Sequence, residues 1–376
     1  MNIAVNTRLL IKDRLDGMGW FSYETLKRIT LAHPEHQFYF LFDRPFNKEF
    51  IFSANITPVV LPPPSRHPIL WFLWLEVSVH RFLRKNKMDV FVSPDGFMPL
   101  RTSTPVVNVI HDINFFHRPA DLPFFSRNYY NFFFPRFAKN ASRVGTVSEY
   151  SATDISQSYE IERSKIDVYH NGVNDIYKPI SEEEIKIVRN NISGGFPYFI
   201  FVGTLHPRKN VANLLRAYDK FMSERKPLIK MVIVGEKMFL TSDIQQVLKG
   251  MKYKDYVIFT GRLSPGELHK VMAASLAMTF IPYFEGFGIP VIEAMKCGIP
   301  VITSNVTSLP EVGGDAVLYS DPDDVEKAAV NMGKIADNEN LRKEYSEKGL
   351  ERVEGFSWDH TAEKFWKSIE KVLNGA

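Results

Sequence analysis

The sequence predicts an α/β protein made of two doubly wound parallel-sheet domains in tandem. Short apolar strands alternate with helical stretches in the first half of the chain, and the alternation starts again in the second half. Such alternation is typical of parallel sheets that are covered by helices on both faces. A length of 376 residues is also too great for one typical core, and it fits two domains of about 150 to 200 residues.

The first half of the chain carries the elements expected of one such domain. Short runs rich in Val, Ile and aromatic residues predict strands at 2–6, 38–42, 59–61, 90–92, 106–110 and 144–147. Helices are expected over 20–31 and 69–86. The run Pro62-Pro63-Pro64 breaks the chain between the third strand and the second helix.

The pattern restarts in the second half, with helical stretches between short strands. These strands are expected at 198–202, 231–234, 257–259, 278–281 and 301–302. The charged segment 181–191 and the glycine turn 193–195 are expected to join the two domains. We therefore assign residues 1–185 to an N-terminal domain and 196–356 to a C-terminal domain. Apolar residues at helical spacing over 358–373 predict a final amphipathic helix.

Composition excludes several classes of protein. A hydrophobic content of 45% with 24% charged residues is typical of a folded globular protein. A net charge of +3 is too small to indicate nucleic-acid binding. The single cysteine, Cys297, leaves no internal disulfide framework, and we interpret it as a small buried hydrophobe rather than a nucleophile. Without a signal peptide or an apolar stretch of ~18 to 20 residues, the protein is expected to be cytoplasmic.

The most informative stretch for chemistry is 285–293, which has a glutamate at each end. Glycines between Glu285 and Glu293 predict a loop, and a proline predicts the start of a helix over 291–297. Backbone N–H groups carry partial positive charge at such a helix start. They can hold phosphates, while the carboxylates accept hydrogen bonds from sugar hydroxyls. A glutamate favoured only by the helix dipole remains the alternative for Glu293.

The stretch 281–304 resembles the E-x7-E region of family GT4, the retaining, nucleotide-sugar-dependent glycosyltransferases with the GT-B fold. The turn 297–300 and the segment 305–316 are similar to the family as well, and the likeness is strongest from about 199 to 321. The resemblance implies two Rossmann-like domains facing across a cleft, the first on the acceptor side and the second binding the donor. It also implies that the last helix, within 357–376, crosses back to the first domain.

The resemblance assigns roles to the two glutamates. Glu285 would orient the transferred sugar, and Glu293 would bind the ribose hydroxyls of the donor. The residues that follow Glu285 are expected to contact the donor too: Gly286, Phe287, Gly288 and Ile289.

The segment 203–210 follows a strand and opens a helix, an arrangement that binds phosphate through N–H groups and cations. Lys209 offers a point charge and Arg208 a forked guanidinium. The resemblance places the donor-diphosphate lysine of the family at Lys209, after the strand glycine Gly203. Many members have an arginine directly after this glycine, where this chain has Thr204. Either Arg208 takes over that contact or Thr204 supplies a hydroxyl, and an exposed loop pair is the alternative to both.

Two positions in the first domain complete the expected site. Gly17 and Gly19 lie in a loop that faces the donor phosphate in the family, with a simple turn into a helix as the alternative. His111 and Asp112 directly follow a predicted strand, and ligands of open α/β sheets bind beyond the carboxyl ends of strands. The resemblance makes His111 a contact to the transferred sugar and Asp112 its neighbour on the acceptor side.

Aromatic residues gather in the segments 69–82 and 115–137. We expect most of these rings to fill the core and a minority to be exposed on the acceptor side. There an aromatic and basic surface would rest on an anionic bilayer. The basic side chains within or near the two segments are Arg81, Arg84, Lys85, Lys87, Arg118, Arg127, Arg136 and Lys139.

We therefore predict a retaining hexosyltransferase of cell-surface polysaccharide synthesis. It would move a hexose from a nucleoside diphosphate sugar to a hydroxyl of a growing, lipid-linked saccharide, at or near the inner face of the cell membrane. The Pro-Arg-Lys-Asn form of 207–210 with Thr204 is most similar to bacterial mannosyltransferases that use GDP-mannose. Enzymes that use UDP-glucose, UDP-galactose or UDP-N-acetylglucosamine share the same frame and stay open as alternatives.

Retention in the family is thought to proceed without a covalent intermediate, with the donor diphosphate receiving the acceptor proton. The Asp-rich turn 321–324 comes too late in the chain to be a metal motif, and it is expected in a surface loop. Cations and N–H groups would then balance the diphosphate, so no metal and no cofactor are expected.

Two other classes remain as alternatives. A nicotinamide-dependent oxidoreductase would need a full G-x-G-x-x-G fingerprint with an acidic residue ~20 positions on, and neither half of the chain offers it. A non-catalytic nucleotide-sugar-binding protein would keep the fold and shed the charged groups. This chain retains Glu285, Glu293, Lys209 and His111 together.

Overall fold

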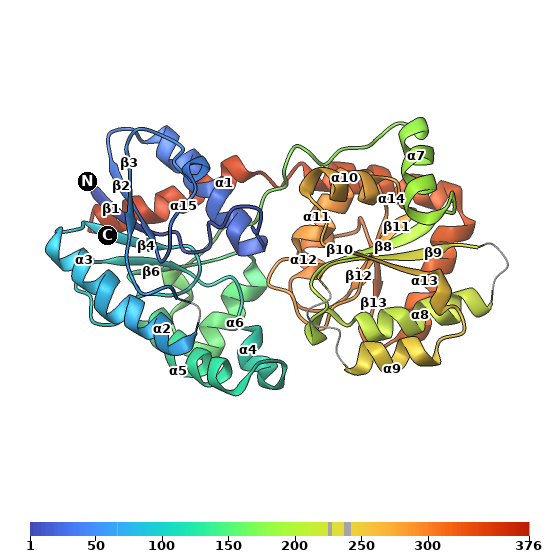
Figure 1. Ribbon diagram of the computed structural model, residues 1–376, viewed down its shortest axis with the longest axis horizontal. Coiled ribbons are helices and arrows are strands. Elements are labelled where there is room, and N and C mark those ends of the chain that lie inside the picture. Colours follow the sequence, from blue (N-terminus) through green and yellow to red (C-terminus); the bar gives the residue numbers. More distant parts are fainter. Residues whose placement is uncertain (66, 225–227, 237–241, 376) are drawn as a thin grey trace. The chain divides into compact units, whose positions relative to one another are not determined.

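The chain folds into two compact units, each with its own sheet. The computed structural model describes residues 1–65, 67–224, 228–236 and 242–375. Unit 1 comprises Met1–Gly172 together with Ser357–Ala376, and unit 2 comprises Val173–Phe356 (Figure 1). Two α/β units in tandem confirm the predicted fold class.

Unit 1 is built on a parallel seven-stranded sheet with the order β3-β2-β1-β4-β5-β6-β7. Strand order reverses next to β1, as in a doubly wound sheet. The sequence missed β7, because a three-residue edge strand leaves too short an apolar run. The strands are β1 (Asn2–Asn6), β2 (Gln37–Phe42), β3 (Ile56–Val60), β4 (Val90–Ser93), β5 (Val106–Val109), β6 (Arg143–Thr146) and β7 (Ile166–Val168).

Helices cover both faces of this sheet (Figure 1). One face carries α1 (Gly17–Ala32) and α15 (Trp358–Leu373). The other carries α2 (Pro68–Leu73), α3 (His80–Lys85), α4 (Asn114–His117), α5 (Phe124–Asn140) and α6 (Glu149–Tyr159). A π-helical segment, Trp74–Val79, joins α2 to α3. The long helix expected over 69–86 is thus present, with π-helical geometry in its middle.

The last helix belongs to unit 1 although the chain reaches it from unit 2. Trp358 and Phe365 of α15 pack against Phe21 of α1, with ring centroids 6.4 and 5.6 Å apart. Gly172 closes unit 1 against the start of α15, where a Cβ would lie 2.2 Å from the backbone nitrogen of Trp358. The predicted return of the C-terminal helix to the first domain is confirmed.

The chain leaves unit 1 earlier than the charged segment indicated. The boundary falls at Gly172–Val173, whereas the sequence placed the join over 181–195. Most of that segment forms α7 (Glu182–Ser193), and Arg189 of α7 donates to the Ala274 carbonyl at 2.9 Å. This helix resembles a linker in the sequence because it is rich in charged residues and little buried.

Unit 2 repeats the doubly wound plan on a parallel six-stranded sheet with the order β10-β9-β8-β11-β12-β13. The order again reverses beside the first strand of the unit, β8, which matches a dinucleotide-binding sheet. The short edge strand β13 escaped prediction, as β7 did. The strands are β8 (Tyr198–Val202), β9 (Lys230–Val234), β10 (Val257–Gly261), β11 (Ala277–Phe280), β12 (Val301–Ser304) and β13 (Leu318–Ser320).

Both faces of this second sheet are covered by helices as well (Figure 1). One face carries α8 (Val211–Ser223), α9 (Ser242–Gly250) and α13 (Val325–Asp337). The other carries α7, α10 (Pro265–Ala273), α11 (Ile289–Lys296) and α14 (Glu339–Val353), and the short α12 is Leu309–Gly313. The helix expected over 291–297 is α11, with Pro290 in its first turn.

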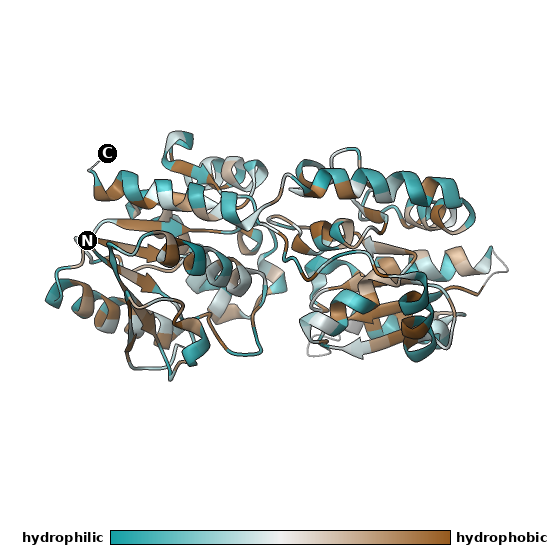
Figure 2. Cartoon of the chain, turned by 90° about the horizontal axis from the view of Figure 1, so that it is seen from above, coloured by the Kyte–Doolittle hydropathy of each residue, from teal (hydrophilic) through white to brown (hydrophobic). Residues whose placement is uncertain are grey.

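Apolar residues concentrate on the strands, while the outer faces of the helices are hydrophilic (Figure 2). Most rings of the two aromatic segments are buried or pack against the core of unit 1, as predicted. The exposed minority comprises Phe72, Phe116, Phe124, Phe125 and Phe132. Among the helices that the structure describes, none has the length and apolar content needed to cross a membrane.

Candidate functional site

The predicted phosphate-binding segment begins where β8 ends. Gly203 donates its N–H to the Val234 carbonyl at 3.0 Å and turns the chain with a φ of +153°. Gly235 must be small, because a Cβ there would lie 1.9 Å from the carbonyl oxygen of Gly203. The chain then forms the 3-10 helix η5 (Pro207–Lys209) before α8. The expected order of strand, glycine, cations and helix is present.

Lys209, Arg208 and Glu285 converge into one ion-paired cluster. Lys209 Nζ and Arg208 Nη1 both contact Oε1 of Glu285, Arg208 at 2.7 Å. Arg208 also donates to the Phe284 carbonyl at 3.0 Å. Lys209 and Glu285 each keep only 7% of their surface exposed. The two side chains assigned to the diphosphate and the one assigned to the sugar therefore meet at a single carboxylate oxygen.

Residues that the sequence did not single out hold this cluster in place. Asn210 has a left-handed backbone with a φ of +57°, and its amide donates to two carbonyls of neighbouring loops at 2.6 and 3.0 Å. Ser308 donates to the carbonyl of Glu285 at 2.9 Å, and the N–H of Glu285 donates to Thr307 Oγ1 at 3.3 Å. They lie in the segments 203–210 and 305–316 that resemble the family, but the sequence assigned none of them a role of its own.

Glycine shapes the loop that follows Glu285. Gly288 has a φ of +98° and is the N-cap of α11, and a Cβ there would lie 2.7 Å from a side chain of α12. Phe287 is buried and packs edge-on against Phe356, with ring centroids 5.6 Å apart. Gly286 is buried and Ile289 is half-buried. Of these expected donor contacts, Phe287 can offer only its backbone, because its ring belongs to the core.

Glu293 lies within α11 and has different partners from Glu285. Its carboxyl lies near the hydroxyl of Tyr177. Burial raises the pKa of Glu293 to about 8, so the carboxyl is mostly protonated at neutral pH. Cys297 lies one turn further on and is buried, and burial raises the pKa of its thiol. This confirms Cys297 as a packing residue rather than a nucleophile.

In unit 1, His111 lies just beyond the end of β5. Its Nε2 contacts the Pro94 carbonyl at 2.8 Å, and its ring packs edge-on against Phe21 of α1, with centroids 4.9 Å apart. Burial lowers the pKa of His111, so the ring is neutral at pH 7. Nε2 then carries the proton and Nδ1 is the acceptor. Held in this way, His111 can hydrogen-bond a sugar but brings no charge to it.

Asp112 and the two N-terminal glycines serve the local structure. Asp112 Oδ1 accepts from the N–H and the amide of Asn114, at 3.0 and 2.5 Å, next to the short α4. The expected loop at Gly17 and Gly19 is wrong, because α1 already begins at Gly17. Asp16 caps the helix by accepting from the N–H of Gly19 at 2.9 Å. Gly17 and Gly19 thus lie in the first turn of the helix, and any role of these glycines toward a donor stays a prediction.

Thr204 and Arg208 differ in how close they come to the cluster. Thr204 is exposed, and its carbonyl accepts from His206 at 2.8 Å. Arg208 shares the carboxylate oxygen of Glu285 with Lys209. The geometry therefore favours Arg208 as the second cation for a phosphate group.

Possible metal ligands gather elsewhere. Within the described residues, ligand atoms of His33, Glu35 and His36 lie within 4.8 Å of one another. These residues precede β2 and so lie at the amino edge of its sheet, whereas His111 lies at the carboxyl edge. The cluster at Glu285 offers two cations, which suit an anionic ligand rather than a metal ion.

Comparison with known proteins relates this arrangement to others. Residues 17–176 match the family described as Glycosyltransferase Family 4, and residues 182–352 match the one described as Glycosyl transferases group 1. The chain is 27% identical over 362 residues to O-antigen chain mannosyltransferase B of Escherichia coli, covering 93% of this chain and 94% of that protein. It is 31% identical over 259 residues to O-antigen chain mannosyltransferase RfbU of Salmonella typhimurium, covering 68% of each. A structure of Anabaena HepE in complex with UDP and glucose matches with a TM-score of 0.76 at 16% identity, covering 99% of this chain and 100% of that one.

Proposed function

This chain belongs to the family 4 glycosyltransferases, and on that premise we propose that it moves mannose from GDP-mannose to a hydroxyl of a growing cell-surface saccharide. Family and fold make the chain a hexosyltransferase of the GT-B type. The choice of mannose is supported by two relatives named as O-antigen mannosyltransferases. A UDP-sugar donor is the alternative that the experiment below separates from it.

The observation that carries this proposal is the cluster of Lys209, Arg208 and Glu285. Two cations lie together at one carboxylate oxygen of Glu285. A pair of cations placed side by side suits an anionic ligand that both side chains can contact at once. A diphosphate supplies such an anion, and N–H groups between the end of β8 and the start of α8 add to its binding.

Glu285 gains its role when the diphosphate takes the two cations. Its carboxylate then has acceptor positions for the hydroxyls of the transferred sugar. We extend the proposal to the ribose contact by Glu293 and to a sugar contact by the neutral ring of His111. The reaction would retain configuration, with the donor diphosphate accepting the proton of the acceptor hydroxyl. Two cations and N–H groups would balance the diphosphate in place of a divalent metal.

A lipid-linked acceptor is proposed from the surface of unit 1. A groove of about 690 Å³ is lined by residues of α2 and α5 that include Ile69, Phe72, Phe125 and Phe132. Phe125 and Phe132 keep 68% and 53% of their surface exposed. The Arg136 guanidinium lies 3.7 Å over the ring of Phe132. Exposed rings beside cations suit the boundary between anionic headgroups and acyl chains.

Liposome co-sedimentation tests this surface. Binding at low salt to vesicles with anionic lipid is expected, and the Phe125→Ser, Phe132→Ser double variant should lose it. If the wild-type chain does not co-sediment with vesicles of any composition, membrane contact is refuted, whereas the proposed donor site is unaffected.

Calorimetric titration with GDP, UDP and ADP tests the donor site directly. GDP is expected to bind most tightly, and Lys209→Ala should weaken its binding. Preference for UDP would move the proposal to a UDP-sugar donor. If the wild-type chain does not distinguish GDP, UDP and ADP, the proposed donor site is refuted.

A further inference from the structure

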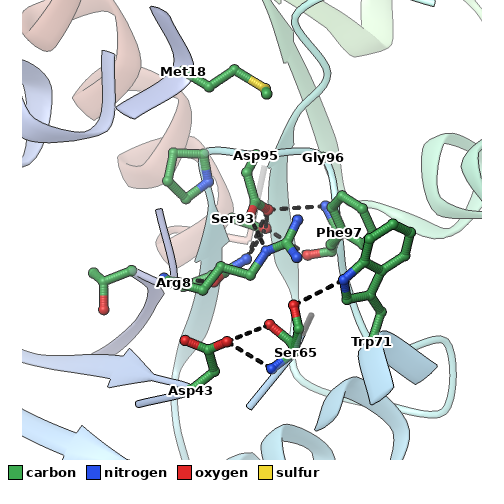
Figure 3. Close-up of polar contacts among 12 residues, drawn as sticks. Arg8, Met18, Asp43, Ser65, Trp71, Ser93, Asp95, Gly96 and Phe97 are labelled. Carbon is green, nitrogen blue, oxygen red and sulfur yellow. Dashed lines mark hydrogen bonds and ion pairs between the residues drawn. The ribbon is translucent and has the colours of Figure 1, made fainter. Parts of the chain in front are cut away.

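A second polar cluster lies in unit 1, at the carboxyl ends of β1 and β4, and centres on Asp95 (Figure 3). Asp95 is buried. Its Oδ1 accepts from Asn6 Nδ2 at 2.7 Å, from Ser93 Oγ at 3.0 Å and from the N–H of Phe97 at 3.2 Å. Its Oδ2 accepts from Arg8 Nε at 2.5 Å. Asp95 is thus fully satisfied by the chain itself.

Arg8 is not satisfied in the same way. A guanidinium has five N–H donors, and within the described residues that of Arg8 donates only through Nε, to Asp95. The side chain keeps just 11% of its surface exposed. Its central carbon lies 3.9 Å from the ring centroid of Phe97 and 6.0 Å from that of Trp71. The two terminal amino groups are therefore held beside these rings, and they can donate to an acceptor from water or a ligand.

The neighbouring carboxylate does not take these donors. Asp43 binds both Nε and Nη2 of Arg44 at 2.6 Å, and it accepts from the N–H and the hydroxyl of Ser65 at 2.7 Å. Trp71 donates to the Ser65 carbonyl at 2.9 Å, which fixes its indole near Arg8 (Figure 3). Arg44 is therefore bidentate on a carboxylate, whereas Arg8 offers one edge of its guanidinium to something else.

The loop that carries Asp95 also anchors His111. The carbonyl of Pro94, the residue before Asp95, contacts His111 Nε2. Gly96, the residue after it, has a φ of +87°, and a Cβ there would lie 2.8 Å from a phenylalanine ring of α5. One tightly packed loop thus holds both Arg8 and His111, the proposed sugar contact.

We propose that the terminal amino groups of Arg8 bind hydroxyl groups of a neutral acceptor saccharide, beside the partly exposed ring of Trp71. Arg8 takes this role only if the chain transfers sugar as proposed above, and the role narrows the acceptor class. The charge of Arg8 is already matched by Asp95, so a phosphate or carboxylate ligand would place an unmatched negative charge against buried carboxylates. Sugar hydroxyls accept from fixed N–H donors without that cost, and their carbon faces pack on aromatic rings.

The wild-type chain provides the first test. Saturation-transfer NMR measures binding of the neutral methyl glycosides of mannose, glucose, galactose and N-acetylglucosamine. Mannose 6-phosphate and methyl glucuronide serve as anionic counterparts. At least one neutral glycoside should bind about tenfold more tightly than both anionic sugars. Preference for an anionic sugar, or no binding of any neutral glycoside, would overturn the assignment without the need for a variant.

A matched pair of variants provides the second test. Arg8→Lys keeps the charge and a contact for Asp95 but removes the forked amino groups. It should weaken binding of the preferred glycoside about tenfold and leave GDP affinity unchanged, because Lys209 lies in the other unit. Arg44→Lys should leave glycoside binding unchanged. Equal effects of the two variants would contradict the role of Arg8, whereas failure of the wild-type chain to bind any nucleoside diphosphate would instead refute the donor site.

Discussion

Replacing Glu285 by glutamine tests whether its carboxylate competes with a bound diphosphate for Lys209 and Arg208. In the structure, the carboxylate of Glu285 holds Arg208 at 2.7 Å and contacts Lys209 as well. A diphosphate must therefore compete with Glu285 for both cations. The variant Glu285→Gln keeps the size and the acceptor oxygen but removes the negative charge. Affinity for the nucleoside diphosphate should rise, while turnover of the sugar nucleotide should fall because the sugar loses its carboxylate contact.

The size of this effect follows from the two contacts. A hydrogen bond to a charged partner contributes about 1.5 to 3 kcal/mol, and a neutral one about 0.5 to 1.5 kcal/mol. The substitution thus weakens the interaction of the side chain at position 285 by about 1 kcal/mol for each cation, or up to about 2 kcal/mol in total. A diphosphate then displaces this side chain at a lower cost in free energy. With a tenfold change for every ~1.4 kcal/mol, GDP should bind about 5- to 30-fold more tightly.

Calorimetric titration of GDP measures this change, with Lys209→Ala as the matched comparison. Loss of the Lys209 charge removes a phosphate contact of about 1.5 to 3 kcal/mol and should weaken GDP binding by about 10- to 150-fold. If Glu285→Gln lost GDP affinity while Lys209→Ala kept it, the two roles would be reversed and the competition would be refuted.

Two further predictions concern stability. Burial raises the pKa of Glu293 to about 8, above the ~4.3 of an unfolded chain, so the folded state binds this proton more tightly. The stability that this bound proton contributes is therefore lost as the pH rises from ~4 through 8. Glu293→Gln should therefore flatten the fall in melting temperature between pH 5 and pH 9, and an unchanged slope would contradict the burial of this carboxyl. Gly172→Ala should destabilise the fold by more than ~3 kcal/mol in urea titrations, because its Cβ would lie 2.2 Å from the backbone of Trp358. Gly266→Ala is the control: it lies in α10 with no atom within 4 Å of a Cβ, and should stabilise slightly, so similar losses in both variants would count against the contact at Gly172.

Much of the fold was readable from the sequence because local pattern and tertiary role agree. Tyr198–Val202 and Trp358–Leu373 were predicted with the bounds that the structure shows, since each is a strongly patterned run with clear breaks. The edge strands β7 and β13 were missed because three residues carry too little pattern. α7 was mistaken for a join because its docking on unit 2 depends on contacts such as Arg189 with Ala274, which are remote in sequence.

In the candidate site too, local features were predicted from the sequence and contacts between remote residues were not. Lys209, Arg208 and Glu285 were found because a resemblance and a strand-to-helix spacing pointed to them. Their convergence on one carboxylate oxygen was not predicted, because it joins positions about 76 residues apart. Arg8 was missed for a related reason. Only the structure shows that Asp95, in the loop after β4, occupies a single edge of its guanidinium.

Transfer of labelled sugar tests the central claim most directly. The chain is incubated with radiolabelled GDP-mannose, with and without the neutral glycoside that it binds best, and the release of labelled sugar or product is followed. The account predicts slow donor hydrolysis by the wild-type chain, faster transfer once the glycoside is added, and loss of both in Lys209→Ala. Binding of GDP without turnover of GDP-mannose or any UDP-sugar would contradict it and would identify a nucleotide-sugar-binding protein without catalysis.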